Sequence, residues 1–176
     1  ELANRYDTPL LFMHNTTGYM VGSEYERGGI IKHGAMMINA VSNSEVPHLS
    51  LITAASYGAG HYGMCGRAFD PRFLYTWPSA KSAVMGGQQL ADVVTSVAAA
   101  ASAARGQEMD QETIDGLKTA IADQIEKESL PAFLSGMLYD DGVIDPRDTR
   151  TVLGLSLSAI HSGEVAGTDR FGVFRM

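Results

Sequence analysis

The sequence predicts an α/β fold in a single domain. Short apolar segments of strand length alternate with longer segments in which apolar residues recur every three to four positions, and this alternation is typical of α/β proteins. The chain has 176 residues, which is enough for one domain with a substantial core. The sequence shows no internal repeat, heptad array or low-complexity segment that would indicate another architecture.

Four segments are predicted to form strands. Each is a short, mainly apolar run, and the runs cover residues 9–13, 46–54, 73–77 and 83–85. Residues 14–22 form a polar, glycine-containing loop after the first run. Pro78 ends the third run, because proline cannot donate a hydrogen bond to a sheet, and the Gly86-Gly87 pair closes the fourth.

The helical segments follow from apolar periodicity and from capping residues. We expect helices over residues 26–42, 88–104, 110–127, 130–138 and 147–160. The second of these is rich in alanine, which predicts close contact with another helix, and Asp110 is a typical N-cap of the third. Residues 140–146 are predicted to form a turn, a strand fragment and a helix start at Pro146, and the tail after Ser162 is predicted to be extended.

The composition excludes several classes of protein. A net charge of −7 argues against a nucleic-acid partner bound through phosphate contacts. No apolar run approaches the ~18 residues that a membrane span requires. Cys65 is the single cysteine, so the sequence predicts no internal disulfide, no cysteine-rich metal site and a cytoplasmic location. The five histidines show no metal-binding spacing, so no metal is expected.

The most informative segment is Ser56-Tyr57-Gly58-Ala59-Gly60-His61-Tyr62-Gly63-Met64, which follows an apolar strand. Small residues at the end of a strand allow another group to approach the backbone closely. If the turn opens a helix, the N–H groups of its first turn point outward and can stabilise a developing negative charge. Taken alone, however, the turn could be only a tight corner. Its Gly-x-Gly-x-x-Gly spacing is weak evidence for a dinucleotide site, because no acid occurs between Pro71 and Ala91.

Other candidate residues have simpler interpretations. His14 and His61 could face one site as a general base, but we interpret them as hydrogen-bonding loop histidines. The paired acids Asp140 and Asp141 are interpreted as turn and cap formers. Cys65 is expected to be a small buried residue rather than a nucleophile, and Trp77 a core residue rather than a ligand platform.

Seven ordered segments together resemble one family. They are Phe12-Met13-His14-Asn15-Thr16-Thr17-Gly18-Tyr19-Met20-Val21-Gly22, Gly29-Ile30-Ile31-Lys32-His33-Gly34-Ala35, Ser56 to Met64, Asp70-Pro71-Arg72-Phe73, Trp77-Pro78, Ser82-Ala83-Val84-Met85-Gly86-Gly87 and residues 139–150. In this order they resemble the carboxyltransferase β subunit of biotin-dependent acyl-CoA carboxylases, in the branch of methylcrotonoyl-CoA, geranyl-CoA and long-chain acyl-CoA carboxylases.

The resemblance implies a crotonase-like fold, a spiral of β-β-α units, in which residues 1–176 form the C-terminal, carboxybiotin-side domain. The N-terminal domain, which holds the acyl-CoA, is absent from the sequence. The chain opens without Met and soon enters a strand, and we interpret it as a fragment that is inactive alone. The resemblance further implies an acyl-CoA substrate, a homo-oligomer that is hexameric in the family, and an α subunit that carries biotin. That subunit's biotin carboxylase uses ATP and bicarbonate.

The resemblance also implies a catalytic arrangement. Carboxybiotin releases CO2, the resulting anion accepts a proton from the acyl thioester, and the carbanion captures CO2. The backbone N–H groups of Ala59 and Gly60 match the oxyanion hole that faces biotin. The facing loop and the wall of the biotin site are then expected to include Thr17, Gly18, Tyr19, Gly58, His61, Tyr62, Trp77, Ala83, Met85 and Gly86, with Tyr62 shaping the acyl pocket.

Two other functions remain open from the sequence. A different crotonase-type enzyme, such as a hydratase, isomerase or decarboxylase, would require a Glu or Asp base near Ala59 and Gly60, whereas a carboxyltransferase can let biotin act as the base. A degenerate domain of this fold could instead serve as a non-catalytic scaffold for oligomerisation.

Overall fold

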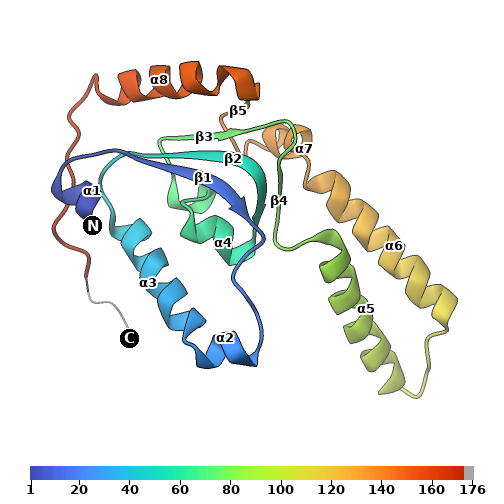
Figure 1. The fold of residues 1–176 in the computed structure, drawn as a ribbon. Coiled ribbons are helices and arrows are strands. Elements are labelled where there is room, and N and C mark those ends of the chain that lie inside the picture. The colour runs from blue at the N-terminus through green and yellow to red at the C-terminus, as the bar shows by residue number, and fades with distance from the viewer. Residues whose placement is uncertain (173–176) are drawn as a thin grey trace.

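The computed structural model describes residues 1–172 and contains a parallel sheet with helices on both faces (Figure 1). The strands are β1 (Leu10–Thr16), β2 (His48–Tyr57), β3 (Phe73–Thr76), β4 (Lys81–Ala83) and β5 (Gly142–Val143). Their order is β1-β2-β3-β5, and β4 also pairs with β2. The α/β class predicted from the alternating pattern is therefore confirmed.

The long strand β2 is the centre of the sheet. β1 pairs along one side of it, from Leu10 opposite His48 to Thr16 opposite Ser56. β3 and β4 follow one another along the other side, beside residues 49–52 and 55–57 of β2 respectively. Residues 48–52 are all buried, as expected for a strand that is covered on both faces.

Helices cover the two faces of the sheet. α2 (Ser23–Arg27), α3 (Ile30–Asn43) and α4 (Gly58–Gly63) lie on one face, and α8 (Thr149–Ile160) lies on the other (Figure 1). Two hydrogen bonds attach α8 to the sheet. The Trp77 indole N–H donates to Thr149 Oγ1 at 3.0 Å, and the Tyr75 and Ser156 hydroxyls lie 2.9 Å apart.

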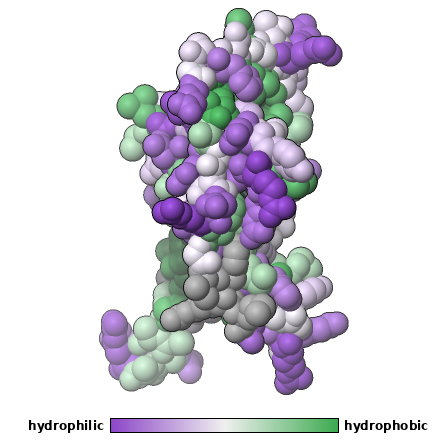
Figure 2. Space-filling view, turned by 90° about the vertical axis from the view of Figure 1, so that its left-hand side faces the viewer, coloured by the Kyte–Doolittle hydropathy of each residue, from purple (hydrophilic) through white to green (hydrophobic). Residues whose placement is uncertain are grey.

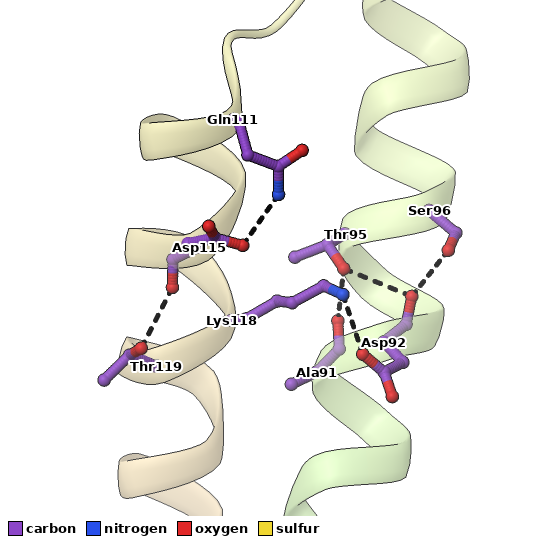
Figure 3. Close-up of polar contacts among 8 residues, drawn as sticks. All are labelled: Ala91, Asp92, Thr95, Ser96, Gln111, Asp115, Lys118 and Thr119. Carbon is purple, nitrogen blue, oxygen red and sulfur yellow. Dashed lines mark hydrogen bonds and ion pairs between the residues drawn. The ribbon is translucent and has the colours of Figure 1, made fainter.

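α5 (Gly87–Ala103) and α6 (Gln111–Glu128) form a hairpin that projects from the sheet (Figure 1). A Cβ at Gly87 would lie 3.1 Å from the Ala122 carbonyl oxygen, so the two backbones approach closely there. Ala91 and Thr95 are buried and point toward α6, and Lys118 forms an ion pair with Asp92 at 2.9 Å (Figure 3). The close helix contact predicted from the alanine-rich sequence is confirmed. α7 (Pro131–Gly136) follows α6.

A short helix, α1 (Leu2–Arg5), joins distant parts of the chain. Asn4 is buried, and its Oδ1 accepts hydrogen bonds from the backbone N–H groups of Glu45, Val46 and Thr168 at 2.9, 3.3 and 3.2 Å. Figure 2 shows the surface on the left-hand side of Figure 1, where α1 lies. Hydrophilic and hydrophobic residues are interspersed on this surface. The sequence does not predict α1, because four residues carry no helical period.

Several predicted boundaries were wrong. The helix expected over 26–42 is two helices, because Gly29 adopts a left-handed φ of +89° between α2 and α3. The fourth strand is Lys81–Ala83 rather than 83–85, since these residues pair with the end of β2. β1 extends to Thr16, so His14 lies in a strand rather than in a loop. The tail predicted to be extended contains no helix or strand over 164–172, and its last four residues lie outside the described part.

We expect Ala91→Leu to lower the free energy of unfolding by about 1–3 kcal/mol, because the larger side chain must displace α6. Ala100→Leu, at an exposed position of the same helix, is the matched control and should change it by less than about 0.5 kcal/mol. Denaturant unfolding of the two variants measures the difference. Equal stability of the two variants would show that α5 and α6 are not tightly packed at Ala91.

Candidate functional site

A cavity of about 650 Å³ lies beneath the point where β2 turns into α4. Its walls come from β2 and β3, the first turns of α4, residues 82–85, the facing parts of α5, α6 and α7, and residues 139–140. Most of the lining is apolar, including Ile52, Leu74, Leu90 and Phe133. An apolar cavity of this size with a few polar groups is a typical small-molecule site.

The predicted glycine-rich turn does open a helix. Gly58 has a φ of +54°, and a Cβ there would lie 2.8 Å from the Val84 carbonyl oxygen, so only glycine fits without strain. No side chain caps α4, and the N–H groups of Ala59 and Gly60 donate no hydrogen bond to any of residues 1–172. Two backbone donors therefore remain free at the start of α4, beside the cavity.

The loop after β1 packs directly against this turn. Gly60 is buried, and a Cβ there would lie 2.9 Å from Thr16 Oγ1 and 3.0 Å from the Gly18 Cα atom. The Gly18 N–H donates to Thr16 Oγ1 at 3.2 Å. The two glycine-bearing segments therefore lie together, as the sequence analysis expected.

The structure brings only some of the predicted site residues into the cavity. Gly58, Ala59, His61, Tyr62, Ala83 and Met85 line it, whereas Thr17, Gly18, Tyr19, Gly60, Trp77 and Gly86 do not. Trp77 donates a hydrogen bond to α8, on the other face of the sheet. Gly86 is the N-cap of α5, and the Tyr19 hydroxyl lies 3.5 Å from the Gly34 carbonyl oxygen of α3. Of the segment from Trp77 to Gly87, only residues 82–85 therefore line the cavity.

His14 and His61 share one hydrogen-bonding partner. Ser56 Oγ lies 2.8 Å from His14 Nδ1 and 2.8 Å from His61 Nδ1. The Arg67 backbone N–H donates to His61 Nε2 at 3.3 Å. His61 Nε2 is therefore an acceptor and Nδ1 carries the proton, so His61 donates to Ser56, and the Ser56 hydroxyl donates to His14 Nδ1. We assign these tautomers from the hydrogen-bond pattern.

Both histidines are held neutral. Burial, together with the nearby His61, lowers the pKa of His14 to about 4, and the Met64 carbonyl opposes this shift. Burial also lowers the pKa of His61. The interpretation of both as hydrogen-bonding histidines agrees with this geometry, although His14 lies in β1. His61 does not present a free basic nitrogen to the cavity.

The two adjacent acids have different environments. Asp141 Oδ2 accepts the Leu74 N–H at 2.7 Å and Asp141 Oδ1 lies 3.5 Å from Arg67 Nη1, so Asp141 is structural, as predicted. Asp140 lines the cavity and is 7% exposed, and neither of its carboxylate oxygens has a hydrogen-bond partner among residues 1–172. The interpretation of Asp140 as a turn former missed this position, because no local pattern distinguishes two adjacent acids.

The described residues provide neither a reactive thiol nor a metal-binding cluster. Cys65 is buried, and burial raises the pKa of its thiol to about 12, so it is a small core residue, as expected. Over residues 1–172, no cluster of three His, Cys, Asp or Glu side chains could hold a metal ion. None of the helices in that range has the length and apolar character needed to cross a membrane.

Comparison with known proteins gives a consistent result. The family model for the carboxyl transferase domain matches residues 1–173. The probable biotin-dependent acyl-coenzyme A carboxylase beta2 subunit of Mycobacterium tuberculosis is 71% identical over 100% of this chain and 33% of its own length. The mitochondrial methylcrotonoyl-CoA carboxylase beta chain of Arabidopsis thaliana is 47% identical over 100% of this chain and 30% of its own.

Solved structures show the same fold. The beta subunit of Pseudomonas aeruginosa geranyl-CoA carboxylase matches with a TM-score of 0.82 and 43% identity, over 98% of this chain and 32% of that one. The transcarboxylase 12S structure, described as a hexamer assembly, matches with a TM-score of 0.80 and 27% identity, over 99% of this chain and 32% of that one. The expected crotonase-like fold is confirmed, and the chain spans about a third of the length of these relatives.

The low pKa of His14 predicts a pH dependence of stability. The unfolded chain binds a proton near pH 6.5 and the folded chain only near pH 4, so stability is lost as the pH falls between these values. We expect a total loss of about 3 kcal/mol, which begins about one pH unit above the unfolded pKa and is complete about one unit below the folded pKa. As the pH falls below about 7.5, the free energy of unfolding of the wild type, measured with denaturant, should therefore fall more steeply than that of His14→Gln, which does not titrate. Parallel pH profiles would contradict the assignment.

Proposed function

The chain belongs to the carboxyl transferase domain family, and we propose from this that it is the carboxybiotin-side domain of an acyl-CoA carboxylase β subunit. Residues 1–176 then correspond to the C-terminal domain, and the acyl-CoA-side domain lies outside this sequence. The complete protein transfers a carboxyl group from carboxybiotin to an acyl-CoA.

One observation carries the chemical part of this proposal. The free N–H groups of Ala59 and Gly60 lie at the first turn of α4, where Ala59 lines an apolar cavity and Gly60 is buried next to it in the chain. Carboxybiotin bound in this cavity would supply the carboxyl group, and the N–H groups of Ala59 and Gly60 would stabilise negative charge on its ureido oxygen. Two backbone donors that are already oriented stabilise such a charge without reorganisation, especially where water is excluded. A ureido oxygen is an acceptor without a proton, so it fits two N–H donors.

The surrounding residues support this role in three ways. Gly58 and Gly60 allow the turn to approach Val84 and the loop after β1 without a clash. The apolar lining limits water, which strengthens the interaction of the N–H groups with a charge. His61 is hydrogen-bonded to the Arg67 N–H and to Ser56, so it offers no free basic nitrogen for proton removal from an acyl thioester.

The relatives support a set of partners. We propose biotin on a carrier of an α subunit, whose biotin carboxylase uses ATP and bicarbonate, and an acyl-CoA substrate. The transcarboxylase 12S relative is described as a hexamer, which supports a homohexamer here. The identity of 71% to an acyl-coenzyme A carboxylase subunit and of 47% to a methylcrotonoyl-CoA carboxylase chain supports the acyl-CoA class. A cytoplasmic location stays a prediction from the single cysteine.

One observation favours a second candidate function. Asp140 is a buried carboxylate without a partner in the described structure, and it lines the same cavity as Ala59. A crotonase-type hydratase, isomerase or decarboxylase would use a carboxylate in the cavity as its base. We rank this function second, because the family and its relatives are carboxyltransferases.

Ala59→Pro in the complete β subunit, assembled with its biotinylated partner, should reduce kcat for carboxyl transfer about 100- to 1000-fold, because proline removes one oxyanion donor. Proline is tolerated in the first turn of a helix, so the fold should survive. Ala59→Ser keeps the N–H and is the control, with an expected change of less than threefold. Transfer of labelled carboxyl to a panel of acyl-CoAs gives the rates, and light scattering checks assembly. An assembled proline variant with full activity would refute this role.

Asp140→Asn separates the two candidate functions. For a carboxyltransferase, we expect biotin-dependent carboxylation to survive, with kcat reduced less than tenfold, since that reaction would need no protein carboxylate as its base. For a hydratase or isomerase, biotin-independent exchange of the acyl α-proton with deuterated water should occur in the wild type and disappear in the variant. Mass spectrometry of the recovered acyl-CoA measures that exchange, and its presence without biotin would favour the second function.

A further inference from the structure

Ser56 Oγ joins three elements at one point. It lies at the carboxyl end of β2, it accepts the Nδ1–H of His61 from α4, and it donates to His14 Nδ1 from β1, with both distances at 2.8 Å. Ser56 and His14 are completely buried. Neither lines the cavity, so the contacts serve no ligand directly.

We propose that Ser56 and His14 are positioning residues that, acting through His61, hold the Ala59 and Gly60 N–H groups in place for catalysis. The proposal rests on the proposed function of those N–H groups. It adds two residues that touch no reacting atom and a requirement that both histidines remain neutral.

The covalent spacing explains how the contacts reach the turn. Ser56 precedes Gly58 by two residues, and its carbonyl also accepts the Ser82 hydroxyl at 2.8 Å, so both the main chain and the side chain of Ser56 are fixed. His14 precedes Thr16 by two residues, and Thr16 contacts the position of Gly60. His61 follows Gly60 directly. A shift of any of the three partners would therefore move one side of the turn.

The protons of the three groups allow only one arrangement. The Arg67 N–H occupies His61 Nε2, which leaves the Nδ1–H for Ser56, and Ser56 has one proton to give to His14. If His14 is protonated, its Nδ1–H also points at Ser56, and the Ser56 hydroxyl proton loses its acceptor. If His61 is protonated, its Nε2–H opposes the Arg67 N–H. Either event breaks a hydrogen bond that is buried or partly buried.

Few other charges face these rings. The two histidine rings lie 5.5 Å apart between centroids, so two positive charges there would repel each other. From α4, Tyr62 lies edge-on to His61 at 6.4 Å. Arg67 meets His61 only through its backbone, because its guanidinium faces Asp141. These contacts place no carboxylate against either ring to stabilise a protonated form.

The same protein contains a matched control. His48, also buried and in β2, has its Nε2 at 2.8 Å from Ser44 Oγ, at the opposite end of the strand from the turn. Ser44→Ala removes a part-buried His–Ser contact far along the strand from Ala59, together with the hydrogen bond that Asn4 Nδ2 donates to Ser44 Oγ at 2.6 Å. A merely structural effect should appear equally in Ser44→Ala and Ser56→Ala.

The test uses the complete β subunit assembled with its biotinylated α partner. Ser56→Ala should lower kcat at pH 8 at least tenfold and change KM for the acyl-CoA less than threefold, while Ser44→Ala changes kcat less than twofold. His14→Leu should lose activity as Ser56→Ala does, and His14→Gln, whose side-chain oxygen can accept the Ser56 proton, should recover most of it.

A pH profile tests the neutrality requirement. The double variant His14→Gln/His61→Asn keeps hydrogen-bonding groups but does not titrate. When kcat is normalised to its value at pH 8, the wild type should fall on the acid side, and the double variant should fall only at lower pH. An unchanged acid limb in the double variant, or equal kcat in Ser56→Ala and Ser44→Ala, would overturn the proposal.

Hydrogen exchange gives a reading that does not depend on activity. The Met64 and Cys65 N–H groups bond back to Gly60 and Tyr62 of α4 at 3.1 and 2.9 Å. Ser56→Ala should speed their exchange at least tenfold relative to Ser44→Ala. If the wild type transfers carboxyl to no acyl-CoA, the proposed function fails, whereas unchanged exchange in Ser56→Ala contradicts the positioning role in either case.

Discussion

The pairing of β2 on both of its sides is the constraint on which the site depends. β1 is bonded along one side, and β3 and β4 are bonded in succession along the other, so the carboxyl end of β2 has little freedom. Because the chain turns into α4 at that end, the first N–H groups of the helix inherit the rigidity of the sheet. Sites built on strands and helices are placed more accurately than sites on loops.

Close backbone contact is the second requirement, and it explains where glycine is needed. At Gly58 and Gly60 a Cβ would meet the backbone of Val84 and the loop after β1, and at Gly87 it would meet α6. These contacts bring residues 82–85 and the α5–α6 hairpin to the rim of one cavity. Backbone packing therefore determines the shape of the cavity, and the side chains that line it make it mostly apolar.

The sequence predicted what is local and missed what is tertiary. The alternation of strands and helices, the turn at Gly58 and the N-cap at Asp110, which accepts the Thr113 N–H, depend on nearby residues and are confirmed. The direction of Trp77 depends on α8, the buried position of Asp140 on β2 and β3, and the hydrogen bonds of Ser56 on β1, and each of these elements lies far away in the chain. No pattern of residues near these positions specifies such partners. The roles of the site residues remain predictions.

The hydrogen bonds of Asn4 have a consequence for biosynthesis. This side chain near the start of the sequence bonds the backbone at Glu45, Val46 and Thr168. A ribosome delivers Thr168 more than 160 residues after Asn4, so the third bond cannot form until nearly the whole segment has emerged. Contacts so distant in sequence slow folding, because the intervening chain must be ordered first. During translation, the buried amide of Asn4 is left with an incomplete set of partners, and the nascent segment closes only when its last residues arrive.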